Sequence, residues 1–311
     1  MMPELEQNKP DVSIVIVNYN VQNLILKCLQ SIEDYCQLSD IEIIVVDNNS
    51  SDESVAMVKH HFPYVVLIEN TKNEGFPKAN NQAFAKARGQ YIFMLNPDAE
   101  LCDDAVSMLR NYMETNPFVA LAAPKLLNTD GSFQQSFWRF PSMRYIIAED
   151  FYCKPLLKKK HYNDKNVNEI LMVDSVSGAA MFFRKSILNL VGELDETLFW
   201  IEDVDFCYRI AQQNMKIAYV PSVQVVHHIG QSAKKNYEIS ISNQVYNKIK
   251  FVGKHYSKWQ SVWIKLHSFF IVGLKIIIFG MLAPFNNIYR LKAKAYVYTI
   301  KRVFNPPTGI K

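Results

Sequence analysis

Residues 172–209 read MVDSVSGAAMFFRKSILNLVGELDETLFWIEDVDFCYR. They contain an apolar run, of the kind that is usually buried, that leads onto Gly178. A segment with helical spacing follows later in the stretch, and its first residues are acidic. Three acids and an arginine follow a turn in the order Glu202, Asp203, Asp205 and Arg209. If residues 202–213 are helical, Asp205 and Arg209 lie four positions apart on one face and can form an ion pair. The first two acids then occupy the first turn, where carboxylates interact favourably with the helix dipole.

This pairing leaves one first-turn carboxylate available as a general base. The apolar residues directly before it, Phe199, Trp200 and Ile201, would partly desolvate that carboxylate and make it a better proton acceptor. A simpler alternative stays open, because acids at the start of a helix are often no more than favourable first-turn residues.

The composition is that of an ordinary globular protein. At 311 residues, with 49% hydrophobic and 21% charged residues, the chain is long enough for one large domain or two smaller ones. Its five cysteines lack the spacing of a metal site or a disulfide framework, which indicates a reducing compartment. The opening MMPELEQNKPD is polar and unlike a signal sequence, so we expect a cytoplasmic location.

The charge is divided unevenly along the chain. The formal net charge is +4, but residues 234–311 carry 14 Lys and Arg and one acid, a net charge of +13, so the preceding residues carry −9. On charge alone, such a basic tail fits either nucleic acid or an anionic membrane surface.

Apolar runs alternate with helical patterns over the first 127 residues. Continuous β-branched runs predict buried parallel strands, and the segments between them predict helices. The predicted strands are 12–17, 41–46, 65–68, 91–95 and 119–127, and the predicted helices are 24–35, 53–61, 77–88 and 103–115. This alternation predicts an α/β fold with a mixed, mostly parallel sheet flanked by helices.

Polar residues follow two of these strands at the edge where ligands of such sheets bind. Asp47 ends the second strand, and Asn96 and Asp98 follow the fourth. Each alone is compatible with ordinary turn chemistry, but together they favour a binding site. Neither G-x-G-x-x-G nor G-x-x-x-x-G-K-[ST] occurs, which argues against a dinucleotide oxidoreductase and a P-loop enzyme.

The chain after residue 140 is less regular. Residues 141–170 show no clear period, so we expect a mobile loop or a short insertion there. Residues 224–232 then predict a short strand that closes on His227 and His228.

Seven segments in order resemble family 2 of the inverting glycosyltransferases with the GT-A fold, and within it the rhamnosyltransferase-like branch. They are SIVIVNYN (13–20), VVDNNSSDES (45–54), NEGFPKANNQA (73–83), LNPDAE (95–100), SGAAMFFRKSILNLVGELDE (177–196), EDVDFCYR (202–209) and HHIGQS (227–232). The resemblance implies a GT-A catalytic domain over 1–235, with a nucleotide-binding half at about 11–127 and an acceptor half at about 128–235. It implies an inverting transfer of a sugar, such as rhamnose from dTDP-rhamnose, to a lipid-linked or surface polysaccharide acceptor.

The resemblance also implies which residues contact the nucleotide. Asp47 would bind the base, with Asn18 and Tyr19 lining its pocket. Asn81 falls on the helix that faces the donor in this family. Asn96 stands at the first D-x-D position, where its amide can hydrogen-bond a ribose hydroxyl.

A divalent metal, Mg²⁺ or Mn²⁺, is implied beside the donor diphosphate. Asp98 at the second D-x-D position and the downstream His227 would hold it, with His228 as the alternative to His227. These ions prefer hard oxygen ligands and take several from phosphate and water, so few protein ligands suffice. Asn96 departs from the family pattern, since an amide binds metal more weakly than the expected carboxylate.

On the acceptor side, the resemblance makes Asp203 the catalytic base and Glu202 its support. Gly178 would lie where a side chain would crowd the acceptor, and Trp200 and Arg139 would face the acceptor.

The tail, residues 236–311, reads as basic, apolar and helical. Within 259–285 two lysines and a histidine interrupt the apolar residues, so the uninterrupted pieces are too short for a membrane-spanning helix. An interfacial helix or re-entrant hairpin on the inner face of the cell membrane is expected. The alternative is packing on the catalytic body or in a dimer; the oligomeric state stays open, and nucleic acid is not expected as a partner.

Three other functions compete with this interpretation. A sugar nucleotidyltransferase normally has a Gly-rich, Arg-containing loop after the first strand, where this chain has Asn18-Tyr19-Asn20-Val21. A glycosyltransferase with another UDP- or GDP-hexose donor would share the same motifs. A non-catalytic scaffold is supported only by Asn96.

Overall fold

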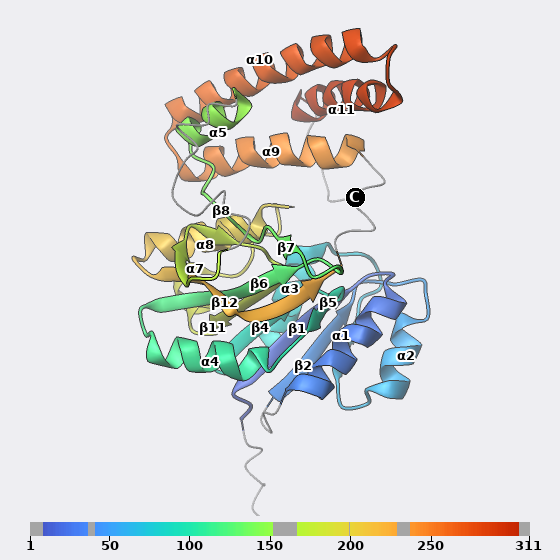
Figure 1. Cartoon of the computed structure of the whole chain (residues 1–311), viewed down its shortest axis with the longest axis vertical. Helices are drawn as coiled ribbons and strands as arrows, with labels where there is room; N and C mark the ends of the chain where they lie inside the picture. The colour runs from blue at the N-terminus through green and yellow to red at the C-terminus, as the bar shows by residue number, and fades with distance from the viewer. Residues whose placement is uncertain (1–8, 37–40, 152–166, 199, 229–236, 305–311) are drawn as a thin grey trace, which may run out of the picture. The chain divides into compact units, whose positions relative to one another are not determined.

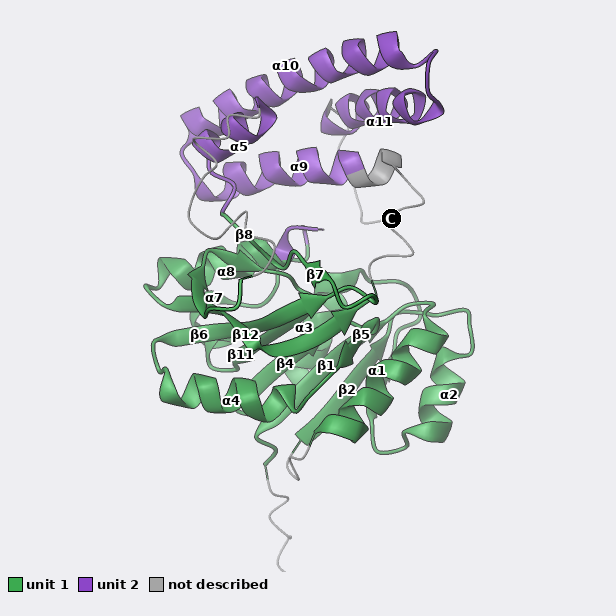
Figure 2. Ribbon diagram, viewed as in Figure 1, with its two compact units in different colours: residues 1–139, 165–196, 203–229 green, residues 140–164, 197–202, 230–311 purple. Residues whose placement is uncertain are grey.

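The computed structural model describes residues 9–36, 41–151, 167–198, 200–228 and 237–304. The chain divides into two compact units, a sheet unit and a helical unit (Figure 2). The sheet unit comprises residues 1–139, 165–196 and 203–229, and the helical unit comprises residues 140–164, 197–202 and 230–311. The helical unit thus includes two segments that precede the tail predicted from residue 236.

The strands of the sheet unit are β1 Val12–Asn18, β2 Ile41–Asp47, β3 Val66–Glu69, β4 Tyr91–Leu95, β5 Ala99–Leu101, β6 Val119–Leu127, β7 Phe133–Gln134, β8 Phe137–Trp138, β9 Leu171–Val173, β10 Ser175–Val176, β11 Ala180–Arg184 and β12 Lys216–His227. The main sheet runs β3-β2-β1-β4-β11-β6-β12-β5, with β7 paired to β6 and β9 to β12; β8 and β10 form a separate pair (Figure 1). Along the main path only β11 and β5 run antiparallel to their neighbours. The predicted mixed, mostly parallel sheet is therefore confirmed.

Helices cover both faces of this sheet. They are α1 Gln22–Tyr35, α2 Ser54–His61, α3 Phe76–Lys86, α4 Ala105–Thr115, α7 Ile187–Val191 and α8 Glu202–Gln212. Helices α1, α2 and α4 bury residues such as Leu29 and Leu109 in one core cluster with Phe182 of β11. The next residue, Phe183, points to the opposite face. There it packs edge-on against Phe84 of α3 and Phe206 of α8.

Strand register gathers polar residues at one edge of the sheet. Asn18 is the register partner of Asp47, so β1 and β2 end side by side. The antiparallel strand β11 begins where β4 ends, and Asn96 N donates to Ala179 O at 2.9 Å. Polar side chains far apart in the sequence therefore leave the sheet together.

A buried carboxylate closes the opposite edge. Glu42 accepts hydrogen bonds from Ser13 Oγ at 2.6 Å and from Arg88 N and Nε at 2.5 and 2.9 Å. Burial acts to raise the pKa of Glu42, but these hydrogen bonds outweigh it and hold the pKa below its ordinary value. Gly89 N donates to Ser13 Oγ at 2.8 Å, which ties the start of β4 to the start of β1.

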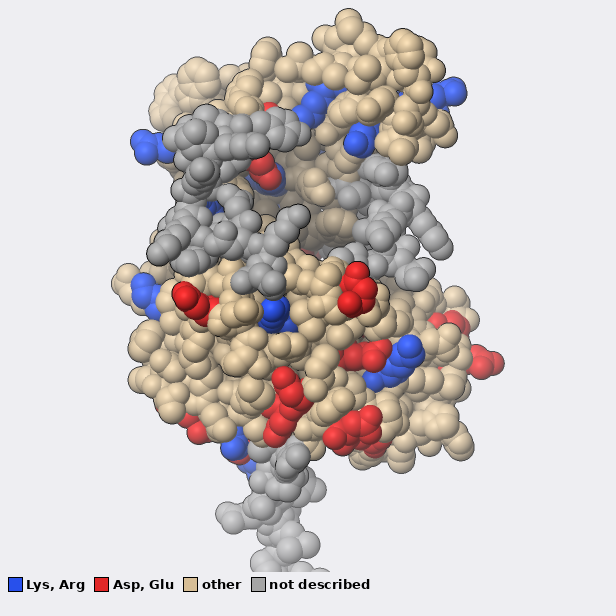
Figure 3. Space-filling view, in the orientation of Figure 1, with Lys and Arg blue, Asp and Glu red and all other residues tan. Residues whose placement is uncertain are grey.

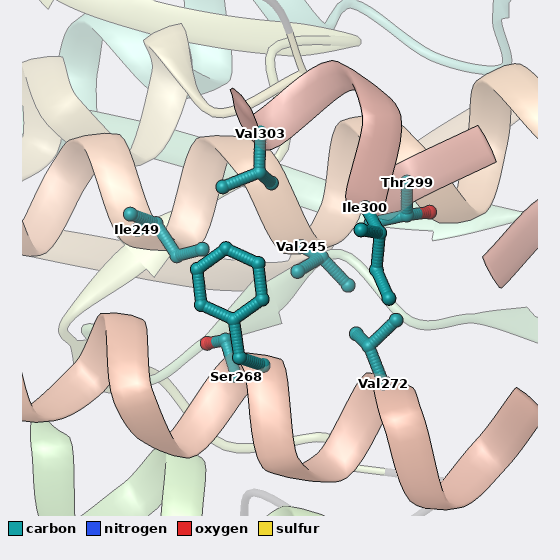
Figure 4. Close-up of a pocket in the computed structure, with 8 residues that line it drawn as sticks. Val245, Ile249, Ser268, Val272, Thr299, Ile300 and Val303 are labelled. Carbon is teal, nitrogen blue, oxygen red and sulfur yellow. The ribbon is translucent and has the colours of Figure 1, made fainter. Parts of the chain in front are cut away.

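The helical unit contains α5 Met143–Asp150, α9 Tyr237–His255, α10 Lys258–Leu282 and α11 Asn287–Phe304. Ile146, Val252 and Ile264 form a buried cluster between α5, α9 and α10. A void of about 10 Å³ lies among α9, α10 and α11, where Ile249, Val272 and other apolar side chains converge (Figure 4). A space of this size holds about one water molecule at most, so we regard it as a packing void.

Two expectations for these segments are corrected. Residues 143–150 form α5 rather than an irregular loop, because Ser142 caps the helix through Tyr145 N and Ile146 is buried; residues 152–166 lie outside the described part. The apolar pieces of 259–285 are joined in the unbroken 25-residue helix α10. Asp150 accepts from His267 Nε2 and Lys275 Nζ, both at 3.1 Å, which turns these two interrupting residues away from the apolar surface.

By length and composition, α10 is long and apolar enough to cross a membrane, and it is the one such helix among the described residues. Within its most apolar window, 17% is buried inside the structure, unlike the core helix of a soluble protein.

We expect Gly89→Ala to destabilise the sheet unit. An added Cβ would lie 2.6 Å from Ser13 N and 2.8 Å from the carbonyl carbon of Val12, and these backbone atoms cannot move without opening the Ser13–Glu42 contact. Overpacking of this kind costs about 1–3 kcal/mol, which thermal unfolding would register as a lower Tm. In Gly273→Ala the added Cβ meets nothing within 4 Å, and a Tm equal to or above that of the wild type is expected. Equal stability of both variants would contradict the close approach.

Candidate active site

The ends of β1 and β2 form a rigid polar pair. Asn18 Nδ2 donates to Asp47 Oδ1 at 2.8 Å, and Ser50 N donates to Asp47 Oδ2 at 2.9 Å. Asn18 and Asp47 are 1% and 3% exposed, whereas the neighbouring Tyr19 ring is 47% exposed. The buried Asn18 Oδ1 has no hydrogen-bond partner among the described residues. This pair presents fixed acceptors beside an aromatic side chain, an arrangement suited to a base with N–H donors.

Asn81, predicted to face the donor, is engaged elsewhere. Its Nδ2 donates to Leu194 O at 2.9 Å and lies 3.3 Å from Glu196 Oε1, and its Oδ1 accepts from Leu194 N at 3.0 Å. The side chain is buried and fixes the segment that leads toward α8. A donor contact by Asn81 stays a prediction, and the geometry gives it a positioning function.

A polar cluster lies where β4 ends and β12 ends. His227 Nε2 lies 3.2 Å from Asp98 Oδ1 and 3.3 Å from Asn96 Nδ2. The buried Asn96 Oδ1 has no hydrogen-bond partner among the described atoms. On the far side of the ring, His227 Nδ1 lies 2.7 Å from Gln134 Oε1. The structure thus brings together Asn96 and Asp98, which stand at the two D-x-D positions, and the downstream His227.

His228 turns away from this cluster. Its Nε2 lies 2.6 Å from Glu100 Oε1, and its backbone N donates to Asp98 O at 2.8 Å. Of the two neighbouring histidines, His227 is therefore the one beside Asp98.

The cluster has side chains suited to a divalent cation. Within the described ranges, however, no group of three His, Cys, Asp or Glu side chains lies close enough together to hold a metal ion. One carboxylate oxygen and the orphaned Asn96 Oδ1 are hard ligands, and His227 adds a nitrogen. A cation between Asp98 and His227 would be bound by one oxygen and one nitrogen, and phosphate and water supply the remaining ligands of Mg²⁺ or Mn²⁺ in sites of this kind. The Asn96 amide faces His227 with Nδ2, so it would have to turn for Oδ1 to join them.

Asp203 lies in the first turn of α8 and is held through its carboxylate. Oδ2 accepts from Gly178 N at 2.9 Å, and Oδ1 accepts from Val204 N at 2.7 Å. Burial of the carboxylate raises the pKa of Asp203, although these backbone hydrogen bonds act to lower it. A Cβ added at Gly178 would touch Asp203 Cβ and Met94 Cε at 3.4 Å, so any side chain there would fill the space beside this carboxylate.

The other predicted acceptor-side residues are described individually. Glu202 is 7% exposed, and its Oε2 accepts from Ile201 N at 3.0 Å. Trp200 is 43% exposed and has a left-handed backbone with φ 74°, which is unusual for a bulky side chain. Arg139 follows β8 and is half-buried. Phe199, expected to wall the carboxylate, lies outside the described residues.

The predicted Asp205–Arg209 pair is confirmed. Arg209 Nε donates to Asp205 Oδ2 at 2.8 Å, and Asp205 is completely buried. The guanidinium also donates to Gly192 O at 3.1 Å, to Glu193 O at 2.7 Å and to Val191 O. Arg209 therefore clamps α8 to the end of α7, which the sequence spacing alone did not show.

Residues 13–190 match the family described as Glycosyl transferase family 2. Because this match covers more than half of the chain, the chain belongs to that family, and it is a glycosyltransferase that uses a nucleotide sugar.

Named relatives agree with this class. Over 225 residues the chain is 26% identical to the low-salt glycan biosynthesis hexosyltransferase Agl10 of Haloferax volcanii, covering 70% of this chain and 67% of that protein. Over 235 residues it is 22% identical to the N-acetylglucosaminyl-diphospho-decaprenol L-rhamnosyltransferase of Mycobacterium tuberculosis, covering 70% and 76%. The fold resembles a mannosyltransferase of Pyrobaculum calidifontis solved with GDP-Man and Mn²⁺, with a TM-score of 0.59, 16% identity, and coverage of 96% of this chain and 88% of that one. The GT-A fold is thereby confirmed.

We expect Arg209→Met to destabilise the protein strongly. It removes the guanidinium from the fully buried Asp205 carboxylate, and breaking a buried pair from one side costs about 3–5 kcal/mol. Chemical unfolding of the full chain would measure the loss. Asp205→Asn in the same chain should recover part of it, because no buried charge then remains.

Arg110→Met is the matched control, since Arg110 pairs with Asp11, whose side chain is 46% exposed. Its effect should stay within about 1 kcal/mol. Equal effects of the two arginine substitutions would show that Arg209 is not a buried brace.

Proposed function

We propose that the protein catalyses an inverting transfer of a hexosyl group, rhamnose from dTDP-rhamnose, to a lipid-linked or surface glycan acceptor at the inner face of the cell membrane. The observation that carries the proposal is the Asp203 carboxylate, oriented by two backbone N–H groups at the sheet edge where Asn96, Asp98 and His227 meet. Similarity to an L-rhamnosyltransferase and a hexosyltransferase of glycan synthesis supports the donor and acceptor classes.

In the proposed reaction Asp203 accepts the proton of the acceptor hydroxyl while that oxygen bonds to the anomeric carbon. The bond from this carbon to the nucleotide diphosphate breaks on the opposite side, so a single displacement inverts the carbon. The raised pKa of Asp203 makes its carboxylate a stronger base. Glu202, next to it in the first turn, is proposed to support the base, and Gly178 to leave room for the acceptor.

The remaining edge residues are proposed to hold the donor. Asn18, Tyr19 and Asp47 would bind the nucleotide base through the buried acceptors and the exposed ring. Asp98 and His227, with the Asn96 amide, would hold a divalent cation. Bound there, Mg²⁺ or Mn²⁺ supplies positive charge that neutralises the departing diphosphate.

Two alternatives rest on specific observations. Sequence identity of 22–26% to the named transferases leaves a different UDP- or GDP-hexose donor open. Asn96 at the first D-x-D position favours a non-catalytic scaffold, but the retained Asp98, His227 and Asp203 oppose it. A thermal-shift screen of nucleotide sugars distinguishes the donors, because a ligand that binds only the native state raises its stability.

We expect Asp203→Asn to reduce transfer by about 10²–10⁴-fold or more, because an amide cannot accept the acceptor proton. Donor binding, measured by calorimetry with the nucleotide sugar that gives the largest thermal shift, should persist. The wild-type rate should fall as the pH drops through the raised pKa of Asp203, at a higher pH than an ordinary aspartate near 3.9 would give.

Asp34→Asn is the control for this substitution, because Asp34 is an exposed aspartate on α1 whose Oδ1 accepts from Gln30 Nε2 at 3.0 Å. Its transfer rate and donor affinity should equal those of the wild type. Retained turnover in Asp203→Asn would remove Asp203 as the base, and absence of donor binding in the wild type would favour the scaffold.

Helix α10 supports the proposed membrane association. Exposed apolar residues recur every three or four positions along it: Trp259, Trp263, Leu266, Phe270, Leu274, Ile277 and Met281, each 41–76% exposed. Residues 239–311 contain no Asp or Glu, and Figure 3 shows basic side chains on the visible face of the helical unit. An apolar stripe with basic neighbours suits the surface of an anionic bilayer. The opposite side of α10 packs on α5, α9 and α11, which favours a helix lying in the surface over a spanning one.

We expect the double substitution Trp263→Glu with Phe270→Glu to abolish binding to phosphatidylglycerol vesicles. Burying one large apolar side chain contributes about 1.5–3 kcal/mol, so losing two should weaken binding by at least about a hundredfold in a flotation assay.

Phe118→Glu with Leu190→Glu in the sheet unit is the matched control, since these two side chains are 53% and 55% exposed and the double substitution adds the same charge. It should leave vesicle binding intact. If the α10 variant floats as the wild type does, the stripe does not contact lipid. If the α10 variant is a monomer in sedimentation experiments without lipid and the wild type is a dimer, the stripe is a subunit contact.

A further inference from the structure

Gln134 contacts both the side chain and the backbone of His227 from β7. Its Oε1 lies 2.7 Å from His227 Nδ1, and its Nε2 donates to His227 O at 2.9 Å. Gln134 is 7% exposed, and it is fixed by pairing with Leu126 of β6. No step of the proposed reaction uses this residue.

The orientation of the Gln134 amide follows from backbone carbonyls, which are acceptors only. The Gln134 atom facing His227 O must be the NH₂ group, so the atom facing His227 Nδ1 is the carbonyl oxygen. A second contact agrees. Asn128 directs its own NH₂ group to Phe133 O and Ser132 Oγ, which leaves Asn128 Oδ1 to accept from Gln134 Nε2 at 3.2 Å.

An acceptor at Nδ1 and a donor at Nε2 together favour a neutral imidazole that carries its proton on Nδ1. With the proton there, Nε2 accepts from Asn96 Nδ2, an N–H donor 3.3 Å away, and lies 3.2 Å from Asp98 Oδ1. Without Gln134, Asp98 would be the strongest acceptor near the ring and would draw the proton to Nε2. The resulting His227–Asp98 hydrogen bond would occupy both groups that a cation needs.

We propose that Gln134 is a positioning residue that holds the neutral His227 ring in the Nδ1–H form, with its Nε2 lone pair beside Asp98, where a divalent cation would replace the Asn96 N–H group as its partner. The inference about the metal rests on the proposed function. The inference about the ring does not, since it concerns the protein without donor or metal.

The ring form can be measured directly in the full-length wild type. Selective ¹⁵N-histidine labelling gives the protonation of each ring nitrogen, and His227→Gln identifies the signals of this residue among the seven histidines. At about pH 8.5, where an ordinary imidazole is neutral, Nδ1 should be protonated and Nε2 should not. A ring protonated on Nε2 would overturn the proposal, whatever the variants do.

The consequence for metal is tested with Gln134→Met, which keeps the side-chain length and removes the amide. Mn²⁺ binding to the full chain, followed by electron paramagnetic resonance, should weaken by about 10- to 100-fold, as for other outer partners of metal-binding histidines. The ring of His227 should change to the Nε2–H form in the same variant.

Gln135→Met is the matched control, because the adjacent glutamine is exposed and donates to Phe137 O. Its Mn²⁺ affinity and ring form should equal those of the wild type. Unchanged Mn²⁺ affinity in a folded Gln134→Met variant would contradict the positioning role. If the wild type has the Nδ1–H ring but transfers no sugar, only the proposed function is contradicted.

Discussion

The antiparallel pairing of β11 with β4 is the contact on which the site depends. Parallel strands all end at one edge of a sheet, so a strand that begins at that edge must run the other way. This reversal places Ala179 against Asn96 N and leaves Gly178 N pointing at Asp203. The register of β11 against β4 thereby brings the end of β4 close to the Asp203 carboxylate of α8.

Two groups that hold the fold make many hydrogen bonds. Glu42 accepts three, and Arg209 donates to Asp205 and to three carbonyl oxygens. At the ligand edge, by contrast, the buried Oδ1 atoms of Asn18 and Asn96 have no hydrogen-bond donor among the described residues. Buried acceptors without donors are unfavourable, so such an edge attracts cations and N–H or O–H donors.

The sequence predicts β1 to β4 and β6 because these strands are continuous apolar runs with polar ends. The acids of α8 follow from their helical spacing and Asp98 from its position after a strand, and the order of the motifs assigns them to one site. Contacts between distant residues were not predictable from local pattern. Gln134 and His227 are 93 positions apart, and Asn81 and Leu194 are 113 apart, so only the folded register brings them together. In α10, the hydropathy pattern makes His267 and Lys275 look like interruptions of the apolar segment. The pattern cannot show that both side chains contact Asp150.

The absence of Asp and Glu from residues 239–311 also determines what can modulate the tail. Lysine and arginine stay charged throughout the neutral range, and the two histidines of this region can only add positive charge on acidification. Electrostatic attraction to an anionic surface therefore cannot reverse with pH. Ionic strength can reduce it, since charges are screened beyond about 10 Å at 0.1 M salt. Any rapid release from such a surface would require a change in salt, in the lipid, or in the covalent charge of the helices, rather than in acidity.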